Sequence, residues 1–98
     1  MELKDLQLLI AIYEEKSISH AAERLYMAQS SLSQFLTNYE QELGCRLFVR
    51  TASGVRPTEA GELLLSYAYR TVSEYKRVQD EMQDTAKLKS GSVILGIN

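Results

Sequence analysis

The 98-residue sequence has one cysteine and one histidine, and this scarcity excludes several classes of protein. Cys45 alone cannot form an intramolecular disulfide, which fits a reducing cytosol. One cysteine, one histidine and no convergent set of carboxylates supply neither a nucleophile with its base nor a cluster of metal ligands. We therefore expect no catalysis, no metal and no cofactor.

Long apolar runs are also missing, and we expect no signal peptide. Hydrophobic residues make up 45% and charged residues 24% of the chain, which are ordinary values for a folded soluble protein. No apolar run approaches the ~20 residues that cross a bilayer. The length suits one small domain with an extension and leaves no room for a large catalytic cleft.

An excess of positive charge is absent too. Eleven lysines and arginines against 13 acidic residues give a net charge of −2, whereas domains that bind nucleic acids are usually basic. The distribution is uneven, because residues 25–39 contain no acid and residues 43–58 contain three arginines but no acid. Such a strip can bind phosphate while acidic residues lie elsewhere. We expect weak non-specific affinity, with more of the selectivity in base contacts.

The stretch from Ser17 to Leu43 predicts two short helices joined by a tight turn, a shape that places the second helix in a DNA major groove. The apolar positions of the first helix are Ala21, Ala22 and Leu25, and those of the second are Leu32, Leu36, Tyr39 and Leu43. The outward face of the second helix carries Ser30, Ser33, Gln34, Thr37, Asn38 and Gln41. These groups are uncharged and can read base edges.

Capping residues set the expected helix limits. Ser19 is a plausible N-cap of the first helix. In the turn at residues 26–28, Tyr26 and Met27 are expected to pack as core. The second helix begins somewhere in residues 29–31, and its cap stays ambiguous, because Ser31 and Gln34 also fit a capping box.

A hairpin is expected after this pair of helices. Gly44 suits a left-handed helix end, and Cys45 is interpreted as a small buried hydrophobe. Residues 47–50 and 55–57 flank a turn-rich tip at residues 51–54, which predicts the wing of a winged helix. Arginine is favoured where a wing follows the backbone or minor groove, so Arg50 is the best candidate contact and Arg56 the second.

Residues from Thr58 to about Leu88 predict one helix roughly 45 Å long. An apolar stripe with spacing close to that of a coiled coil follows it, formed by Ala60, Leu64, Tyr67, Thr71, Tyr75, Val78 and Met82. The first two turns are expected to lie on the chain's own domain. Beyond Tyr67 the sequence offers nothing to cover the stripe, which favours a second chain as its partner.

These features resemble the LysR-type transcriptional regulators of bacteria. The matching residues are Ser17–Leu25, Gln29–Ser33, Glu40–Gly44, Leu47–Arg50 and Thr58–Gly61. The resemblance covers essentially the whole chain but only the amino-terminal third of a typical member. It implies a mainly α fold, with a winged helix-turn-helix domain at residues 1–57 and a dimeric coiled-coil linker helix at residues 58–89. Residues 90–98 would be a hinge and the first strand, at residues 93–97, of a truncated effector-binding domain.

The resemblance also implies a function, which is sequence-specific binding to an inverted-repeat promoter site as a dimer. The DNA contacts would be Ser19, His20, Gln29, Ser30, Ser33, Gln34, Thr37, Arg50, Ser53 and Arg56. The dimer interface would be Leu64, Tyr67, Thr71, Tyr75, Val78 and Met82. Partners would be double-stranded DNA, a second copy, and a small-molecule effector held by the missing carboxyl-terminal domain. The full-length protein would be a tetramer on the nucleoid, in the bacterial cytoplasm.

Two other functions fit the sequence less well. A protein-interaction or dimerisation module is favoured by the net charge and by the acidic first helix. It is disfavoured by the polar second helix and the arginine-bearing hairpin, because protein interfaces are usually centred on aromatic or aliphatic anchors. An enzyme fits poorly, since Glu40 and Glu42 are better explained as a solvated helix end than as a catalytic pair.

Overall fold

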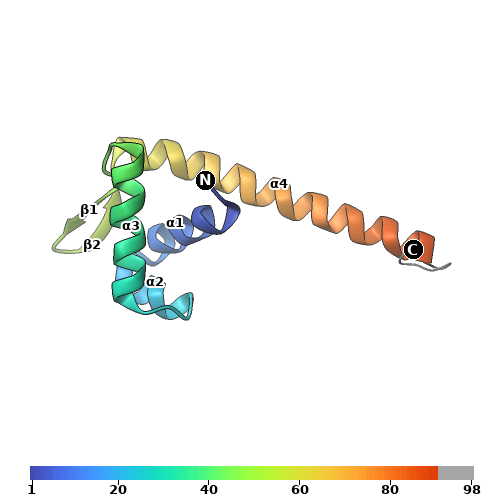
Figure 1. Cartoon of the computed structure of the whole chain (residues 1–98), viewed down its shortest axis with the longest axis horizontal. Coiled ribbons are helices and arrows are strands. Elements are labelled where there is room, and N and C mark those ends of the chain that lie inside the picture. Colours follow the sequence, from blue (N-terminus) through green and yellow to red (C-terminus); the bar gives the residue numbers. More distant parts are fainter. Residues whose placement is uncertain (91–98) are drawn as a thin grey trace.

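The computed structural model describes residues 1–90 and is mainly helical, as predicted. Its elements in chain order are α1 (Leu3–Glu15), α2 (Ile18–Arg24), α3 (Gln29–Leu43), β1 (Phe48–Thr51), β2 (Gly54–Pro57) and α4 (Glu59–Ser90). Helices α1 to α3 form a small body with the hairpin at one side, and α4 projects away from it as a rod (Figure 1). The fold is the predicted winged helix-turn-helix followed by a long helix. The strand predicted at residues 93–97 lies outside the described residues.

Helix α1 forms the centre of the core. Its buried residues are Leu6, Leu8, Leu9, Ile10, Ala11 and Ile12, which cover the two adjoining faces that the sequence predicts. Two apolar faces require two neighbours, and α1 packs against both α2 and α4. The side chains of Glu2 and Asp5 form a capping box at its start, and Lys16 ends it in a left-handed conformation with φ 55°.

Helix α2 begins earlier than predicted. The N-cap is Ser17, whose Oγ accepts a hydrogen bond of 3.1 Å from the backbone N–H of His20, so the prediction of Ser19 was wrong. The earlier start makes Ile18 the first helical residue and buries it in the core. Ala21 and Ala22 are fully buried, because small side chains let α2 approach its neighbours closely.

The turn between α2 and α3 corrects a second expectation. Tyr26 does not pack as core but is 98% exposed, with a left-handed φ of 57° that redirects the chain and turns the ring to solvent. Met27 does pack against the core, as predicted. The sequence shows an aromatic residue here but not its backbone conformation, and the conformation decides where the ring points.

Helix α3 has the predicted buried stripe for most of its length. Leu32, Leu36 and Tyr39 are buried, and Gly44 ends the helix with φ 78°, as predicted. Leu43 and Cys45, which flank that glycine, are exposed, so the prediction that each is buried was wrong. At the left-handed turn the chain leaves the core, and both side chains face solvent.

The N-cap of α3 is Ala28, which has no hydrogen-bonding side chain. The capping box suggested for Ser31 and Gln34 is therefore absent, because the helix already begins at Gln29.

The hairpin is anchored to the body by its second strand. Strands β1 and β2 are antiparallel, with Phe48 opposite Pro57 and Thr51 opposite Gly54. The backbone N–H of Val55 donates a hydrogen bond of 3.0 Å to the carbonyl oxygen of Lys16 at the end of α1. Phe48 and Val55 are buried, so one side of the wing belongs to the core and its tip stays free.

The first turns of α4 lie on the body, as predicted. Thr58 caps the helix, because its Oγ1 accepts from the backbone N–H of Gly61 at 3.0 Å and donates to the carbonyl oxygen of Arg46 at 2.7 Å. Leu65 and Ala68 are buried, and Val72 is the last α4 residue that packs against the core. Residues 73–87 are all exposed.

Candidate nucleic-acid interface

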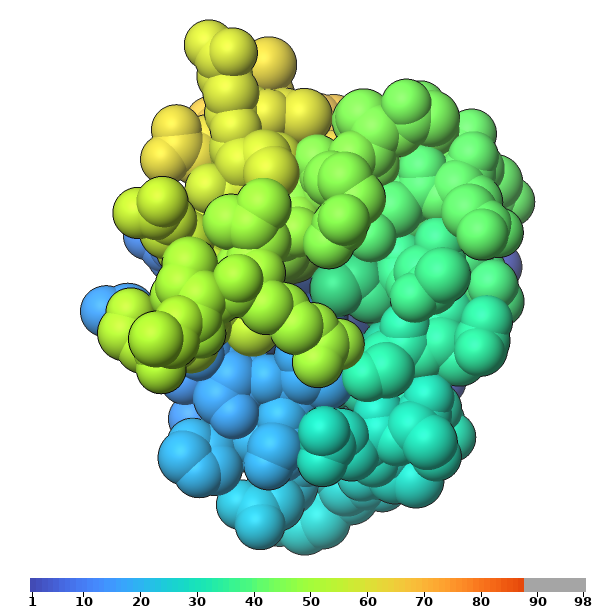
Figure 2. All heavy atoms as spheres, turned by 90° about the vertical axis from the view of Figure 1, so that its left-hand side faces the viewer, coloured from blue at the N-terminus to red at the C-terminus, as the bar shows by residue number. Residues whose placement is uncertain are grey.

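Helices α2 and α3 and the hairpin share one face of the molecule (Figure 2). In that view α2 is light blue, α3 runs from teal to green, and the hairpin is yellow-green. All ten residues that the sequence predicts as DNA contacts belong to these three elements. The fold therefore brings the predicted contacts to one side, although they span residues 19–56 in the chain.

The polar face of α3 is open to solvent. Gln29, Ser30, Gln34 and Thr37 are exposed, and Ser33 is half-buried. The side-chain nitrogen of Gln34 donates a hydrogen bond of 2.8 Å to Oδ1 of Asn38 one turn later. This bond orients the Gln34 amide and leaves its oxygen and a second N–H for another partner.

The amino-terminal turn of α3 can hold an anion. No side chain accepts a hydrogen bond from its backbone, so the first N–H groups point outward without a partner from a cap. These groups and the helix dipole favour a negative charge such as a phosphate. Gln29 and Ser30 lie in this turn, next to the groups that would bind the backbone of a nucleic acid.

Ser19 and His20 occupy the first turn of α2, and both side chains are exposed. Because Ser17 supplies the cap, the hydroxyl of Ser19 is not committed to the helix end. Both residues are therefore exposed and stay predicted DNA contacts, although the capping role assigned to Ser19 was wrong.

The arginines near this face fall into two groups. Arg24 and Arg46 are occupied, Arg24 by Glu14 at 2.8 Å and by a second glutamate, and Arg46 by Glu40 at 3.5 Å. Arg50 and Arg56 are exposed on β1 and β2, and within residues 1–90 neither pairs with a carboxylate. The guanidinium groups of the wing are thus the ones available for phosphate.

Ser53 lies exposed at the wing tip. Its Oγ is 3.2 Å from Oγ1 of Thr51, which also donates to the carbonyl oxygen of Gly54 at 2.9 Å. These contacts order the tip between the two arginine-bearing strands.

Glu40 supports the wing, a role that the sequence did not reveal. Its Oε2 accepts hydrogen bonds from the backbone N–H groups of Leu47 at 2.7 Å and Phe48 at 3.2 Å. Its side chain is only 11% exposed, so the interpretation of Glu40 as part of a solvated helix end was wrong, while Glu42 is exposed as expected. Glu40 fixes the end of α3 to the start of β1 and so sets the wing relative to α3.

A pair of aromatic side chains lies on the core side of α3, near the middle of the helix. The rings of Phe35 and Tyr39 stack with centroids 5.3 Å apart. Burial raises the pKa of Tyr39 above its ordinary value, and the nearby charge of Asp5 raises it further. The hydroxyl of Tyr39 is buried without a hydrogen-bond partner, so this side of α3 faces the core.

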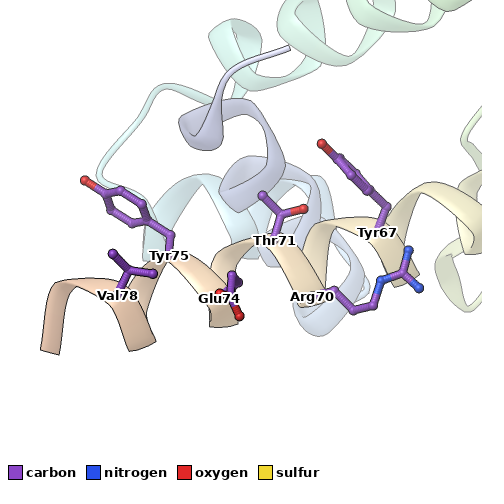
Figure 3. A pocket seen from close by; sticks show the side chains of 6 residues that line it. All are labelled: Tyr67, Arg70, Thr71, Glu74, Tyr75 and Val78. Atoms are coloured by element: carbon purple, nitrogen blue, oxygen red, sulfur yellow. The ribbon is translucent and has the colours of Figure 1, made fainter. Parts of the chain in front are cut away.

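The predicted dimer stripe forms an apolar face on α4. Figure 3 shows Tyr67, Thr71, Tyr75 and Val78 projecting from one side of the helix. With Arg70 and Glu74 they line a shallow groove of about 640 Å³. Leu64, near the body, is half-buried, and Met82 is 57% exposed.

Charged residues beside this stripe pair with one another along the helix. Lys76 lies 3.7 Å from Asp80, and Arg77 bridges Glu74 and Glu81. Glu74, which also lines the groove, is therefore already paired with a charge on its own helix.

The described residues offer neither a metal site nor a membrane span. Among the described residues, no three His, Cys, Asp or Glu side chains cluster so that they could hold a metal ion. None of the helices in residues 1–90 has the length and apolar character of a membrane span.

Comparison with known protein families identifies residues 3–62 as matching the model described as "Bacterial regulatory helix-turn-helix protein, lysR family". Among curated proteins, the chain is 40% identical over 92 residues to the HTH-type transcriptional regulator PgrR of Escherichia coli K12, covering 94% of this chain and 31% of PgrR. It is 33% identical over 97 residues to the nitrogen assimilation regulatory protein nac of Klebsiella aerogenes, covering 99% of this chain and 32% of nac. The chain thus spans about a third of the length of these relatives.

Solved structures give the same result for the fold. The crystal structure of the BenM DBD/catB site 1 DNA complex matches with a TM-score of 0.82 and 34% identity, covering 88% of this chain and 96% of that one. The CbnR DBD-DNA complex matches with a TM-score of 0.78 and 30% identity, covering 88% of this chain and 99% of that one.

Proposed function

Because the chain belongs to the lysR family of bacterial regulatory helix-turn-helix proteins, we propose that it is the sequence-specific DNA-binding part of a transcriptional regulator and not an enzyme. The observation that carries this proposal is the pairing pattern of the arginines. Arg50 and Arg56 stand free of carboxylates beside the uncharged polar face of α3, whereas the two neighbouring arginines are already paired. Free cations next to amides and hydroxyls suit a partner with both phosphates and base edges.

In this proposal α3 enters the major groove. Gln29 and Gln34 can each present a donor and an acceptor together, the pattern that pairs with adenine, and Ser30, Ser33 and Thr37 add hydroxyls. Ser19 and His20 face the DNA backbone from the first turn of α2. The wing follows the backbone or the minor groove with Arg50, Ser53 and Arg56. Phosphate contacts set the register, and base contacts set the sequence preference.

A second copy completes the proposed site. Residues 1–57 would bind one half-site, and residues 58–89 would pair two chains through Leu64, Tyr67, Thr71, Tyr75, Val78 and Met82. A two-fold dimer requires an inverted repeat, with the half-site spacing fixed by the long helices. We place the whole protein in the bacterial cytoplasm on the nucleoid, as a tetramer. Its small-molecule effector would bind to a carboxyl-terminal domain that begins within residues 90–98.

A gel shift with fragmented genomic DNA at low salt tests the proposal. Retarded complexes that dissociate as salt is raised support it, because phosphate contacts release counterions. Complete absence of such complexes would favour the alternative, which is a protein-interaction module. The net charge of −2 is consistent with that alternative. Selection from a random DNA library would then show whether the site is an inverted repeat.

Gln34→Ala is expected to relax base preference more than it lowers overall affinity. Truncation removes an oriented amide from the groove-facing side of α3, and a good bidentate base contact is worth about 1–3 kcal/mol of discrimination. Titrations with cognate and random DNA measure the ratio of the two dissociation constants. Gln83→Ala, at an exposed glutamine on α4 away from α3 and the wing, is the matched control. Equal losses on both DNAs would make Gln34 a structural residue.

Arg50→Ala is expected to reduce the salt dependence of binding by one phosphate contact. The slope of log K against log salt should become shallower by about 0.9 for each half-site bound, and so by about 1.8 when a dimer binds both. Binding isotherms at several salt concentrations provide the slope. Lys76→Ala removes one positive charge from α4, away from the proposed interface, and should leave the slope unchanged. A slope equal to that of the unmodified chain would remove Arg50 from the contacts.

A further inference from the structure

We propose that Tyr69, Glu14 and Arg24 form a latch that fixes the angle between α4 and the helix-turn-helix, and thereby determines the half-site spacing that the dimer accepts. None of the three is among the proposed DNA contacts or the residues of the dimer stripe, so they act by positioning. The inference rests on the proposed function and adds a source of specificity to it.

The latch is a chain of polar contacts through three helices. The hydroxyl of Tyr69 on α4 donates a hydrogen bond of 2.6 Å to Oε2 of Glu14, in the last turn of α1. The other oxygen of Glu14 lies 2.8 Å from Nη1 of Arg24, in the last turn of α2. The same nitrogen lies 3.2 Å from Oε2 of Glu15. The rod is thus connected directly to α1 and, through Glu14, to α2, the first helix of the helix-turn-helix.

The electrostatics of Glu14 agree with this geometry. The hydrogen bond from Tyr69 lowers the pKa of Glu14, and the hydrogen bond from Arg24 lowers it further. Burial and the Glu14 carboxylate raise the pKa of Tyr69 to about 12. A lowered carboxyl pKa stabilises the fold above the ordinary value of 4.5, and this stabilisation is lost as pH falls through the folded pKa. At neutral pH the phenol keeps its proton and Glu14 keeps its charge.

The latch lies beside the packing between α1 and α4 and adds polar contacts to it. Ala68 is fully buried where α4 lies against α1, and its small side chain allows close approach. Leu65 and Val72, about one turn to either side, also pack on the core, so α4 lies along the body over several turns. Tyr69 follows Ala68 directly, and its ring meets that of Tyr13 edge-to-face with centroids 6.3 Å apart. The ring contact and the hydrogen bond together restrain the direction in which the rod leaves.

The angle of α4 affects the half-site spacing because the rod is long compared with the rise of one base pair. Beyond Val72, α4 continues to Ser90, a length of roughly 27 Å at ~1.5 Å per residue, and residues 73–87 of this stretch are exposed. A rotation of about 10° at the root would move the far end by about 5 Å, more than the ~3.4 Å rise of one base pair. Loss of the latch would therefore make the dimer less selective between half-site spacings, without altering the contacts to either half-site.

The latch contributes little to stability, which makes it testable. The side chains of Glu14 and Arg24 are 40% and 43% exposed, and exposed ion pairs are worth little. Tyr69→Phe removes the hydroxyl but keeps the ring, and Arg24 remains paired with Glu14. Tyr13→Phe is the matched control, because it removes a phenolic hydroxyl from the same ring pair but not from the latch.

The test measures affinity for inverted repeats whose half-sites are moved apart or together by one and two base pairs. For Tyr69→Phe, the preference for the best spacing over its neighbours should fall about three- to tenfold, in line with the loss of one exposed hydrogen bond. Affinity for a single half-site and the unfolding temperature should stay within error. Glu14→Gln, which keeps an acceptor for Tyr69 but loses the charge that Arg24 binds, should give a smaller effect.

Two further readouts do not depend on DNA. Spin labels at Cys45 and at Gln83→Cys, in chains diluted with unlabelled protein, should give a broader distance distribution in Tyr69→Phe than in Tyr13→Phe. The pKa of Glu14, followed by carbon NMR, should rise in Tyr69→Phe.

The outcomes distinguish a failure of the latch from a failure of the proposed DNA-binding function. An unchanged spacing profile in Tyr69→Phe, with half-site binding intact, would overturn the latch and leave the proposed function standing. An equal loss on every DNA would also overturn it, since that marks a structural residue. If the unmodified chain binds no DNA in a salt-sensitive manner, the proposed function fails and the spacing role fails with it.

Discussion

Gly61→Ala is expected to destabilise the chain by about 3 kcal/mol or more, although alanine is ordinarily the better helix former by ~1 kcal/mol. A Cβ atom at this position would lie 2.0 Å from the carbonyl oxygen of Leu47 and 3.0 Å from its carbonyl carbon. That oxygen already accepts a hydrogen bond of 2.9 Å from the backbone N–H of Thr58, so it cannot move aside freely. The first turns of α4 would have to separate from the segment that leads into the wing.

Urea unfolding, followed by circular dichroism at one protein concentration, measures this effect. Gly44→Ala is the control, because an added Cβ there meets nothing within 4 Å and only its left-handed φ of 78° is unfavourable. That strain costs about 1–2 kcal/mol. A Gly61→Ala variant no less stable than Gly44→Ala would show that the close approach of α4 to Leu47 is absent in solution.

The sequence predicts the elements because their apolar periodicity is strong. The two stripes of α1 indicate two neighbours, and α2 and α4 are those neighbours. The turn-rich residues 51–54 separate two short strands, and the hairpin turns there. In each case local pattern and tertiary packing agree, so the pattern alone predicts the element.

Local backbone geometry is where prediction failed. Ser17 and Ser19 are equally good caps by residue type, and the burial of Ile18 decides between them. Tyr26 is apolar enough for a core, but its left-handed conformation exposes it. Cys45 follows a helix end, where the chain leaves the core, and its side chain also faces solvent. A single sequence does not reveal such conformations at residues other than glycine.

The candidate interface is predictable only in part. A run of uncharged polar residues marks the face of α3, and the wing arginines stand out in an acid-free segment. The residues that hold these elements in place carry no such mark. Glu40 binds amides seven and eight residues away, and Tyr69 binds a carboxylate 55 residues away. Only the folded structure distinguishes them from the other exposed acids and tyrosines of the chain.

Beyond Val72 the apolar stripe of α4 is exposed, and a second copy of the chain is the partner proposed to cover it. Val78→Asp is expected to convert the proposed dimer to a monomer and to weaken binding to an inverted repeat by about 10²-fold or more, because linked sites bind with that advantage over separate ones. Val78 lies in the exposed part of α4, beyond the last residue that packs on the body, so the fold of the monomer should be unaffected. In a dimer, however, the introduced carboxylate would be buried without a partner, which is costly.

Sedimentation equilibrium and DNA titration on the same samples measure both effects. Ser73→Asp is the matched control, because it adds the same charge to an exposed position on the opposite side of the rod, near Tyr69 and Arg77 and away from the stripe. It should leave the dimer and its affinity nearly unchanged. Affinity for a single half-site should be equal in both variants, since neither alters α3 or the wing. If Val78→Asp stays dimeric, the chains pair through another surface, and the half-site spacing would no longer be set by this face of α4.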